Sequence, residues 1–285
     1  MPELPEVQTT VNGLNKAIQG RRIVRIASTY RSQAYVYKDE IKNPKFFNKF
    51  KKLTLKQKVL GVERRAKNVL IRLSGGHTII VHMKMTGHFV YDKPEHPFIR
   101  LTFELDNGKT LAFSDMRKFA KVTIAKTEEI NKSSHLRHLG PEPLEKSFNL
   151  KQFKTRIERR PKGKIKQVLM DQSVIAGIGN IYADEILWRS GVHPLSKASG
   201  IPRKNIEFMF KAMKEILKKS IAVGGDSMSD YRNIDGKRGG YQNYHHAYRH
   251  TGKACGKQGC KGVISRIMVG ARSAHFCPKH QKLYA

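Results

Sequence analysis

The chain has 285 residues, 39% of them hydrophobic, and its 55 Lys and Arg residues far outnumber its 23 Asp and Glu residues. This length predicts two domains, and the apolar fraction is enough for a buried core. The net charge of +32 exceeds what solubility requires and indicates a polyanionic partner, most simply nucleic acid. We find no apolar run of membrane length and no signal-peptide core, so we expect an intracellular protein.

The first half of the chain changes from one hydrophobic period to another. A helical repeat of apolar residues opens it: Leu4, Val7, Val11, Leu14 and Ile18. Gly20 ends this helix. Short β-branched or alternating runs follow at 23–26, 59–62, 69–73, 78–81, 99–105, 110–113 and 121–124, with turn residues at 74–77 and 106–108. Consecutive hairpins of this kind predict an antiparallel sandwich or barrel, with the first helix packed on it.

Beyond about residue 130 the strand patterns stop. Residues 138–144 indicate a rigid connector, and apolar repeats predict helices at 150–157, 165–169 and 206–221. The polar, glycine-bearing segment 226–240 has no periodicity. A mobile loop and a plain solvated connection are both consistent with it.

The first six residues, Met-Pro-Glu-Leu-Pro-Glu, contain a candidate nucleophile. Removal of Met1 would expose Pro2, and an α-amine, with a pKa near ~7.7–8.0, is partly an uncharged nucleophile at neutral pH. Once bonded to a sugar carbon, a secondary amine gives an iminium that cannot lose an N–H proton, so it acts as an electron sink. Glu3 would supply the adjacent acid or base. A frayed, proline-stiffened tail is the alternative interpretation.

Residues 176–180, Ala-Gly-Ile-Gly-Asn, lie between two apolar helical repeats. The glycines allow a tight turn, and Asn180 is a favourable N-cap for the next helix. Free N–H groups at such a terminus suit a phosphate oxygen. The upstream Lys162, Lys164 and Lys166 favour phosphate binding over a plain helix–helix turn.

All three cysteines lie near the C-terminus, in the pattern Cys255-x4-Cys260-x16-Cys277-x2-His280. An odd number of clustered cysteines, with no signal peptide, argues against disulfides. Three thiolates and one imidazole suit a tetrahedral structural Zn²⁺ site, for which His275 is a rival fourth ligand. Arg266 and Arg272 lie on the hairpin that such a metal would brace, where they can reach phosphates.

Three side chains at strand ends have shapes that could fill the gap left by an extruded base. Met85 follows one strand, and Arg117 and Phe119 follow another. A thioether, a guanidinium and a phenyl ring at loop tips suit such a role. Each taken alone is more often a core or surface residue.

Seven motifs together resemble formamidopyrimidine-DNA glycosylases over nearly the whole chain. They are Pro-Glu-Leu-Pro-Glu-Val at 2–7, Arg-Arg-Ala-Lys at 64–67, Met-Thr-Gly at 85–87, Asp-x-Arg-x-Phe at 115–119, Leu-Gly-Pro-Glu-Pro-Leu at 139–144, Gly-Ile-Gly-Asn-Ile-Tyr at 177–182, and the C-terminal finger. The resemblance implies a bifunctional repair glycosylase and lyase. Such an enzyme excises 8-oxoguanine and formamidopyrimidines from double-stranded DNA and cuts the strand by β,δ-elimination.

The resemblance also implies an architecture. The fold class is α+β: an N-terminal antiparallel β-sandwich with a flanking helix, then a helical domain with a helix-two-turn-helix and a β-hairpin zinc finger. We expect the sandwich at 1–130, a linker at 131–146, the helical domain with a lesion-capping loop at 147–248, and the finger at 249–285. One structural Zn²⁺, a monomer and a cytoplasmic, nucleoid-associated location go with this expectation.

The roles of individual residues follow from the same resemblance. The catalytic set would be Pro2 as Schiff-base nucleophile, Glu3 as acid and base, Lys67 as proton donor near the departing phosphate, and Arg272 for the second elimination. The DNA-binding set would be Met85, His96, Arg117, Phe119, Lys166 and Asn180. The metal set would be Cys255, Cys260, Cys277 and His280.

The sequence departs from the family pattern at several positions. Gln8 stands where Glu is usual, Ala120 where Gly is usual, and the finger has an x4 knuckle and His280 in place of a fourth cysteine. Two alternative functions stay open: a glycosylase for oxidised pyrimidines, like the endonuclease VIII branch, and a DNA-binding module without catalysis. Leu4 and the set Met85, Arg117 and Phe119 favour the purine branch.

Overall fold

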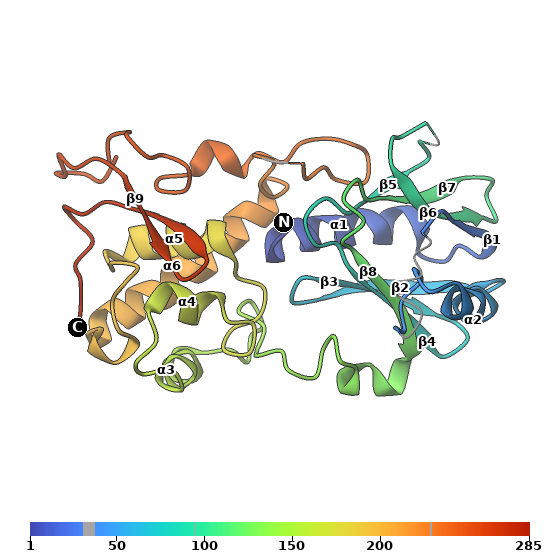
Figure 1. Cartoon of the computed structure of the whole chain (residues 1–285), viewed down its shortest axis with the longest axis horizontal. Coiled ribbons are helices and arrows are strands. Elements are labelled where there is room, and N and C mark those ends of the chain that lie inside the picture. Colours follow the sequence, from blue (N-terminus) through green and yellow to red (C-terminus); the bar gives the residue numbers. More distant parts are fainter. Residues whose placement is uncertain (31–37, 94, 229) are drawn as a thin grey trace. The chain divides into compact units, whose positions relative to one another are not determined.

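The computed structural model describes residues 1–30, 38–93, 95–228 and 230–285, which form two compact units (Figure 1). Unit 1 contains residues 1–137 and 224–240, and unit 2 contains residues 138–223 and 241–285. The segment 224–240 thus belongs with the sandwich, whereas we predicted it within the helical domain. The finger segment 249–285 packs within the helical unit instead of forming a unit of its own.

Unit 1 is an antiparallel β-sandwich with two helices. Its elements are α1 (Leu4–Ile18), β1 (Ile23–Ser28), α2 (Pro44–Thr54), β2 (Val59–Arg65), β3 (Asn68–Leu73), β4 (His77–His82), β5 (His88–Tyr91), β6 (Ile99–Leu105), β7 (Thr110–Ser114), β8 (Lys121–Lys126) and the 3₁₀ helix η2 (Thr127–Lys132). One sheet has the order β1-β6-β7-β5 and the other β2-β3-β4-β8. This confirms the predicted sandwich and its hairpins.

The core of unit 1 lies between these sheets and under α1. The four apolar residues of the helical repeat after Leu4 belong to one buried cluster with residues of both sheets. Because α1 contributes one whole face to this cluster, its N-terminal end is fixed in place. The helix α2 and the short strand β5 were not predicted. Asn43 caps α2 and Pro44 opens it, which is a recognisable helix start.

Unit 2 is mainly helical. It contains α3 (Leu150–Glu158), α4 (Ile165–Met170), α5 (Asn180–Ser190), α6 (Arg203–Ala222), the 3₁₀ helices η3 (Ala198–Gly200) and η4 (Tyr241–Tyr244), and the hairpin β9 (Ser265–Val269) and β10 (Arg272–Phe276). The helix α5 is buried along most of its length and packs on α6 and β10. Within the described ranges, no helix is both long and apolar enough to cross a membrane.

The segment 224–240 is anchored in unit 1, although it follows α6 in the chain. Tyr231 and Ile234 are buried there, and the backbone N–H of Tyr91 donates to the carbonyl of Ile234 (2.9 Å). Gly225 has φ +82°, and a Cβ on it would lie 3.0 Å from Glu6 on α1. Glycine therefore allows the chain to pass close to α1. These contacts hold the described residues around Gly225, Tyr231 and Ile234 against unit 1.

Candidate nucleic-acid interface and metal centre

The helix α1 lies antiparallel to the edge strand β2. Along the helix, Gln19, Asn15 and Gln8 contact Leu60, Val62 and Arg64 in turn. The amide of Gln19 donates to the carbonyl of Leu60 (3.1 Å), Asn15 exchanges two hydrogen bonds with the backbone of Val62 (2.7 and 2.8 Å), and Arg64 Nε donates to Gln8 Oε1 (2.9 Å). The N-terminus of α1 therefore points toward the end of β2.

This arrangement brings Pro2 and Glu3 to the end of the sheet that carries Lys67. The β2–β3 turn follows Arg65 at once, with Ala66 in a left-handed conformation (φ 52°). Arg64 Nη1 also donates to the carbonyl of Ala66 (3.1 Å), so Gln8 supports this turn through Arg64. Gln8, where the family usually has Glu, thus supports the turn with a neutral amide that accepts from the charged guanidinium.

The N-terminal residues are buried and held by a carboxylate. Pro2 is buried, Glu3 is 3% exposed, and Lys67 is 6% exposed. Glu3 and Glu6 form a capping box, in which the backbone N–H of Glu3 donates to Glu6 Oε2 (2.8 Å). The other oxygen of Glu6 accepts from the backbone N–H of Asp226 (2.7 Å). One buried carboxylate thus ties the start of α1 to the segment 224–240.

A histidine that the sequence did not single out lies beside this group. His82 ends β4 opposite Asn68, next to Lys67. Burial, and then the charges of Lys84 and Lys67, lower the pKa of His82 to about 3. The backbone N–H of Lys84 donates to His82 Nδ1 (3.1 Å), so the imidazole is a neutral acceptor there. Only its position in the stretch 82–87, which contains Met85, could have indicated it.

The candidate void-filling side chains come from two loops that one buried aspartate joins. Asp115 is fully buried, and it accepts from Thr86 Oγ1 (2.7 Å) and from the backbone N–H of Ala120 (2.9 Å). Thr86 Oγ1 in turn accepts from the backbone N–H of Arg117 (3.1 Å). The loop that carries Met85 and the loop that carries Arg117 are therefore bound together, which the sequence did not indicate.

The three side chains of this set reach solvent. Met85 is 39% exposed, Phe119 is 50% exposed, and Arg117 is exposed as well. The guanidinium of Arg117 lies 4.7 Å from the centre of the Phe119 ring, which is a cation–π contact. Gly87 must lack a side chain, because a Cβ there would lie 2.5 Å from the carbonyl oxygen of Met83.

His96 lies elsewhere on unit 1, after β5. Its Nε2 is 3.4 Å from Nε2 of His88, and the two rings meet edge to face. Burial lowers the pKa of His88. The structure thus gives His96 a histidine neighbour, and its DNA contact stays a prediction.

In unit 2 the turn before α5 is built around Gln172. Gly177 has φ +89°, and its N–H donates to Gln172 Oε1 (2.9 Å), while Gln172 Nε2 donates to the carbonyl of Ile178 (2.8 Å). The helix begins at Asn180 with Gly179 as N-cap, so the predicted cap position is wrong by one residue. Within the described residues, the buried Asn180 Oδ1 has no hydrogen-bond partner.

Lys166 occupies a place that the sequence did not suggest. It is fully buried, and its Nζ donates to Asp184 Oδ1 (2.5 Å) and to the carbonyl of Ser273 (2.6 Å). Arg272, the residue before Ser273, begins β10 and is exposed. A direct phosphate contact by Lys166 stays a prediction, while Arg272 is placed where a polyanion can reach it.

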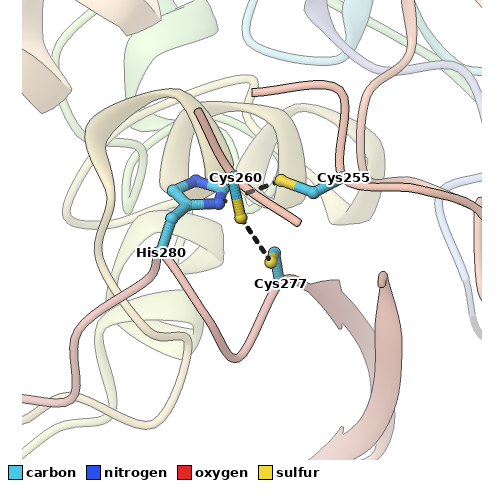
Figure 2. Close-up of side chains that lie close together, drawn as sticks. All are labelled: Cys255, Cys260, Cys277 and His280. Carbon is cyan, nitrogen blue, oxygen red and sulfur yellow. Dashed lines mark hydrogen bonds between the residues drawn. The ribbon is translucent and has the colours of Figure 1, made fainter. Parts of the chain in front are cut away.

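Three cysteines and one histidine converge in unit 2 (Figure 2). The ligand atoms of Cys255, Cys260, Cys277 and His280 all lie within 4.8 Å of one another. The sulfur atoms of Cys260 and Cys277 are 3.7 Å apart, and Cys255 Sγ is 3.0 Å from His280 Nδ1. Such a cluster could hold one metal ion. His275 is not part of it, because its Nδ1 contacts Asp184 Oδ2 (2.9 Å).

Burial and hydrogen bonds shift the pKa values of three of these four groups in different directions. His280 Nε2 donates to the carbonyl of Trp188 (2.9 Å), which leaves the Nδ1 lone pair toward the sulfurs. Burial lowers the pKa of His280, so its neutral form is favoured. Burial raises the pKa of Cys277, but the backbone N–H groups of His280 and Lys279 outweigh it and lower the pKa. Burial raises the pKa of Cys255 to about 11, although Trp188 donates to its sulfur (3.3 Å).

Comparison with known proteins places both units in one family. The family model described as Formamidopyrimidine-DNA glycosylase N-terminal domain matches residues 1–122, and that described as Formamidopyrimidine-DNA glycosylase H2TH domain matches residues 139–232. The formamidopyrimidine-DNA glycosylase of Herpetosiphon aurantiacus is 37% identical over 281 residues, which are 98% of this chain and 98% of that protein.

Solved structures show the same similarity over nearly the whole chain. A Lactococcus lactis Fpg mutant in complex with Fapy-dG-containing DNA has a TM-score of 0.86 and 31% identity, over 97% of this chain and 98% of that chain. A MutM in complex with carbocyclic 8-oxo-G-containing DNA has a TM-score of 0.85 and 31% identity, with the same coverage of 97% and 98%.

Proposed function

The chain belongs to the formamidopyrimidine-DNA glycosylase family, and on this premise we propose that it is a base-excision repair enzyme for oxidised purines in double-stranded DNA. The family match and the DNA complexes of its relatives support this function, and the lesions in those complexes are 8-oxoguanine and a formamidopyrimidine. The net charge of +32 suits a DNA substrate. An enzyme of this kind acts as a monomer in the cytoplasm, where bacterial DNA lies.

The observation that carries the proposal is the antiparallel docking of α1 on β2. It places Pro2, Glu3 and the turn of Lys67 at one end of unit 1, with all three buried. A nucleophile, an acid or base, and a cation at one end of a rigid scaffold are the parts that base excision with strand cleavage requires. In this proposal Met1 is removed, because an acylated Pro2 nitrogen is not nucleophilic.

The reaction then follows from the residue chemistry. The Pro2 nitrogen bonds to C1′ of the sugar as the C1′–N9 bond breaks, and the base leaves with that electron pair and takes up the proton that the Pro2 nitrogen loses. Glu3 protonates the ring oxygen, so that the C1′–O4′ bond breaks and the sugar opens to an iminium. The iminium acidifies C2′, and loss of that proton expels the 3′ phosphate, with Lys67 stabilising its charge. A second proton loss expels the 5′ phosphate with the help of Arg272. Water finally hydrolyses the iminium and frees Pro2.

Base extrusion is assigned to the two bound loops of unit 1. Removing a base from the stack costs a few kcal/mol, and a damaged base costs least. Met85, Arg117 and Phe119 are exposed on loops that Asp115 and Thr86 hold together, so they can enter the duplex without a change in the scaffold. Arg117 has a planar donor group that can face the orphaned base.

Contacts with the DNA backbone are assigned to both units. Asn180 at the start of α5 and Arg272 on the hairpin suit phosphate oxygens, since one lies at a helix N-terminus and the other is an exposed guanidinium. We also assign His96 and Lys166 to backbone contacts. For Lys166 such a contact would be indirect, through the hairpin that its ammonium holds.

The metal centre is assigned to one structural Zn²⁺. Cys255, Cys260, Cys277 and His280 supply the donor set that zinc prefers in closed sites, and the sulfur separation of 3.7 Å between Cys260 and Cys277 suits bonds of about 2.3 Å to one tetrahedral ion. Zinc would connect four ligands within the finger and would take no part in the reaction. Trp188 on α5 holds two of the ligands, which ties the finger to the helices.

Covalent trapping tests the proposal. Borohydride should reduce the iminium and give a protein–DNA adduct on duplex with 8-oxoguanine opposite cytosine, and Pro2→Gly should lower its yield by at least a hundredfold. Pro5→Gly, which also removes a proline from the first turn of α1, is the control and should retain most of the yield. Absence of an adduct from the wild type would leave a DNA-binding module. Faster excision of thymine glycol than of 8-oxoguanine would place the enzyme in the pyrimidine branch.

A further inference from the structure

A buried charge network connects the helices of unit 2 to the hairpin that carries Arg272. Its centre is the ion pair of Lys166 on α4 and Asp184 on α5, and neither side chain is exposed. Asp184 Oδ1 accepts from Lys166 Nζ (2.5 Å). Asp184 Oδ2 accepts from the backbone N–H (3.0 Å) and the Nδ1 (2.9 Å) of His275 on β10. Both oxygens of the carboxylate are therefore engaged.

The second contact of Lys166 lies beside a residue of the proposed reaction. Lys166 Nζ donates to the carbonyl of Ser273 (2.6 Å), and Ser273 directly follows Arg272 in β10. The network thus holds β10 at Ser273 through the lysine and at His275 through the aspartate. Two anchors, two residues apart on one strand, fix both its position and its rotation about its own axis.

The hairpin needs such anchors. β9 and β10 form a sheet of only two strands, and a two-stranded ribbon is marginally stable alone in water. The metal ligand that follows β10 is Cys277, directly beyond the end of the strand, and Arg272 is at the opposite end of that strand. The metal and the charge network therefore secure different parts of the finger.

We propose that Lys166 and Asp184 are positioning residues for Arg272, which set the place of its guanidinium in the second elimination through Ser273 and His275. This rests on the proposed function. A buried ion pair seldom adds much net stability, because desolvation offsets the attraction of the charges. It does select one arrangement, since the ammonium and the carboxylate each lose their hydrogen bonds in any other. Lys166 accordingly serves the DNA through the hairpin, whereas the resemblance described above implies a contact of Lys166 itself with the DNA backbone.

The test separates positioning from stability. In the double variant Lys166→Met with Asp184→Leu, apolar side chains replace the pair, which commonly preserves folding. Asp184→Asn is the single variant, in which the lysine is left without its counter-charge. Glu215→Gln is the matched control, because it removes one charge from the exposed pair of Glu215 with Arg189 in the same unit.

Two readouts are measured below the unfolding temperature of each variant. Hydrogen exchange of the amides in residues 265–276 should become about tenfold to a hundredfold faster in the double variant, as expected on losing hydrogen bonds from charged groups. On abasic DNA, the share of β,δ-product should fall about tenfold in favour of the β-product. Adduct formation by Pro2, measured at protein concentrations that saturate the DNA so that weaker binding does not limit it, should fall much less than the second elimination. Glu215→Gln should change none of these quantities.

The outcomes distinguish this inference from the proposed function. A folded double variant with the product ratio and hairpin exchange of the wild type would overturn the inference, because the network would then be structural packing alone. Equal loss of adduct and of second elimination would overturn it as well. A wild type that forms no adduct would refute the proposed function, and the exchange measurement would still decide whether the network holds the hairpin.

Discussion

In unit 1 the proposed reactive and base-extruding side chains stand on a large apolar core, whereas in unit 2 the hairpin with Arg272 is held by charges and a metal-binding cluster. The loops of Met85 and Arg117 leave two packed sheets and are joined by Asp115. The hairpin belongs to a two-stranded sheet, and the cluster of buried apolar residues around its metal site is small.

This difference predicts which conditions would unfold each unit. A sandwich gains its stability from apolar burial, which depends little on pH, metal or salt near neutrality. A small finger cannot bury enough apolar surface and takes its folding free energy from metal binding. We therefore expect loss of the metal to unfold the finger of unit 2 while unit 1 stays folded.

Loss of the metal site should give the largest effect. Cys260→Ser removes one of the four ligands, and structural zinc contributes about 10 kcal/mol or more to the folding of such fingers. We expect affinity for lesion-containing duplex to fall by about a hundredfold or more, with the β-sheet signal in circular dichroism retained. Fluorescence anisotropy at fixed salt measures the affinity.

The control for this variant is Gln258→Ser, which changes an exposed, uncharged residue of the same knuckle. It should bind DNA and zinc like the wild type. If Cys260→Ser bound DNA as tightly as the wild type, the finger would not depend on its metal, and the contrast between the units would disappear.

Removal of the charge of Asp115 should have an intermediate effect on unit 1. Asp115 accepts hydrogen bonds from Thr86, from the backbone of Ala120 and from Tyr30 OH (2.7 Å). An asparagine cannot accept all three, so Asp115→Asn should lower the free energy of unfolding by about 2–4 kcal/mol. Urea denaturation measures this quantity.

Because Asp115 joins the two loops, the same variant should excise 8-oxoguanine more slowly and still cleave an abasic site, where no base has to be extruded. Asp106→Asn, at an exposed hairpin turn where Asp106 accepts from the backbone of Arg22, is the control with a small effect. Equal loss of both activities in Asp115→Asn would show that the loops are not specific to base extrusion.

The smallest effect should be a pH dependence from His82. Burial, and then the charges of Lys84 and Lys67, lower its pKa in the folded state to about 3, from an ordinary value of 6.5. Above pH 6.5 the imidazole is neutral in both states and contributes no dependence. As the pH falls from 6.5 toward 3, only the unfolded state takes up the proton, so folding loses about 1.4 kcal/mol per pH unit.

Between pH 6.5 and 5 the wild type should therefore lose about 2 kcal/mol of unfolding free energy from this residue, and His82→Gln should remove that loss. His77→Gln, at the other end of β4, should keep the slope of the wild type. The same slope in His82→Gln as in the wild type would show that the imidazole titrates normally beside Lys67.

The sandwich and most helices were predictable from the sequence because they depend on local patterns. The repeat after Leu4 gave α1, and the turn at 106–108 gave the hairpin of β6 and β7. The metal ligands were predictable because they are close in sequence. The choice of His280 over His275 was decided by Asp184, whose carboxylate on α5 engages His275 on β10.

Long-range partners could not be predicted, because a sequence pattern does not show which distant group neutralises a charge. Lys166 has the appearance of a solvated cation within a basic run, yet the structure buries it against Asp184. The segment 224–240 follows a helix of unit 2, yet Glu6 and Tyr231 bind it into unit 1. Its polar composition gave no sign of this.

The sequence by itself determined the chemistry: a proline that can become the N-terminus, a carboxylate beside it, a zinc-type ligand set and a strong positive charge. These are properties of residue types and short spacings, which do not need a fold to be recognised. Only the tertiary structure decided the geometry, that is, the direction of α1 along β2, the joining of two loops by Asp115, and the burial of Lys166. Each of these features depends on contacts between groups that are far apart in the chain. A buried polar or charged group needs a hydrogen-bonding or charged partner, and only the packed fold determines which residue supplies that partner.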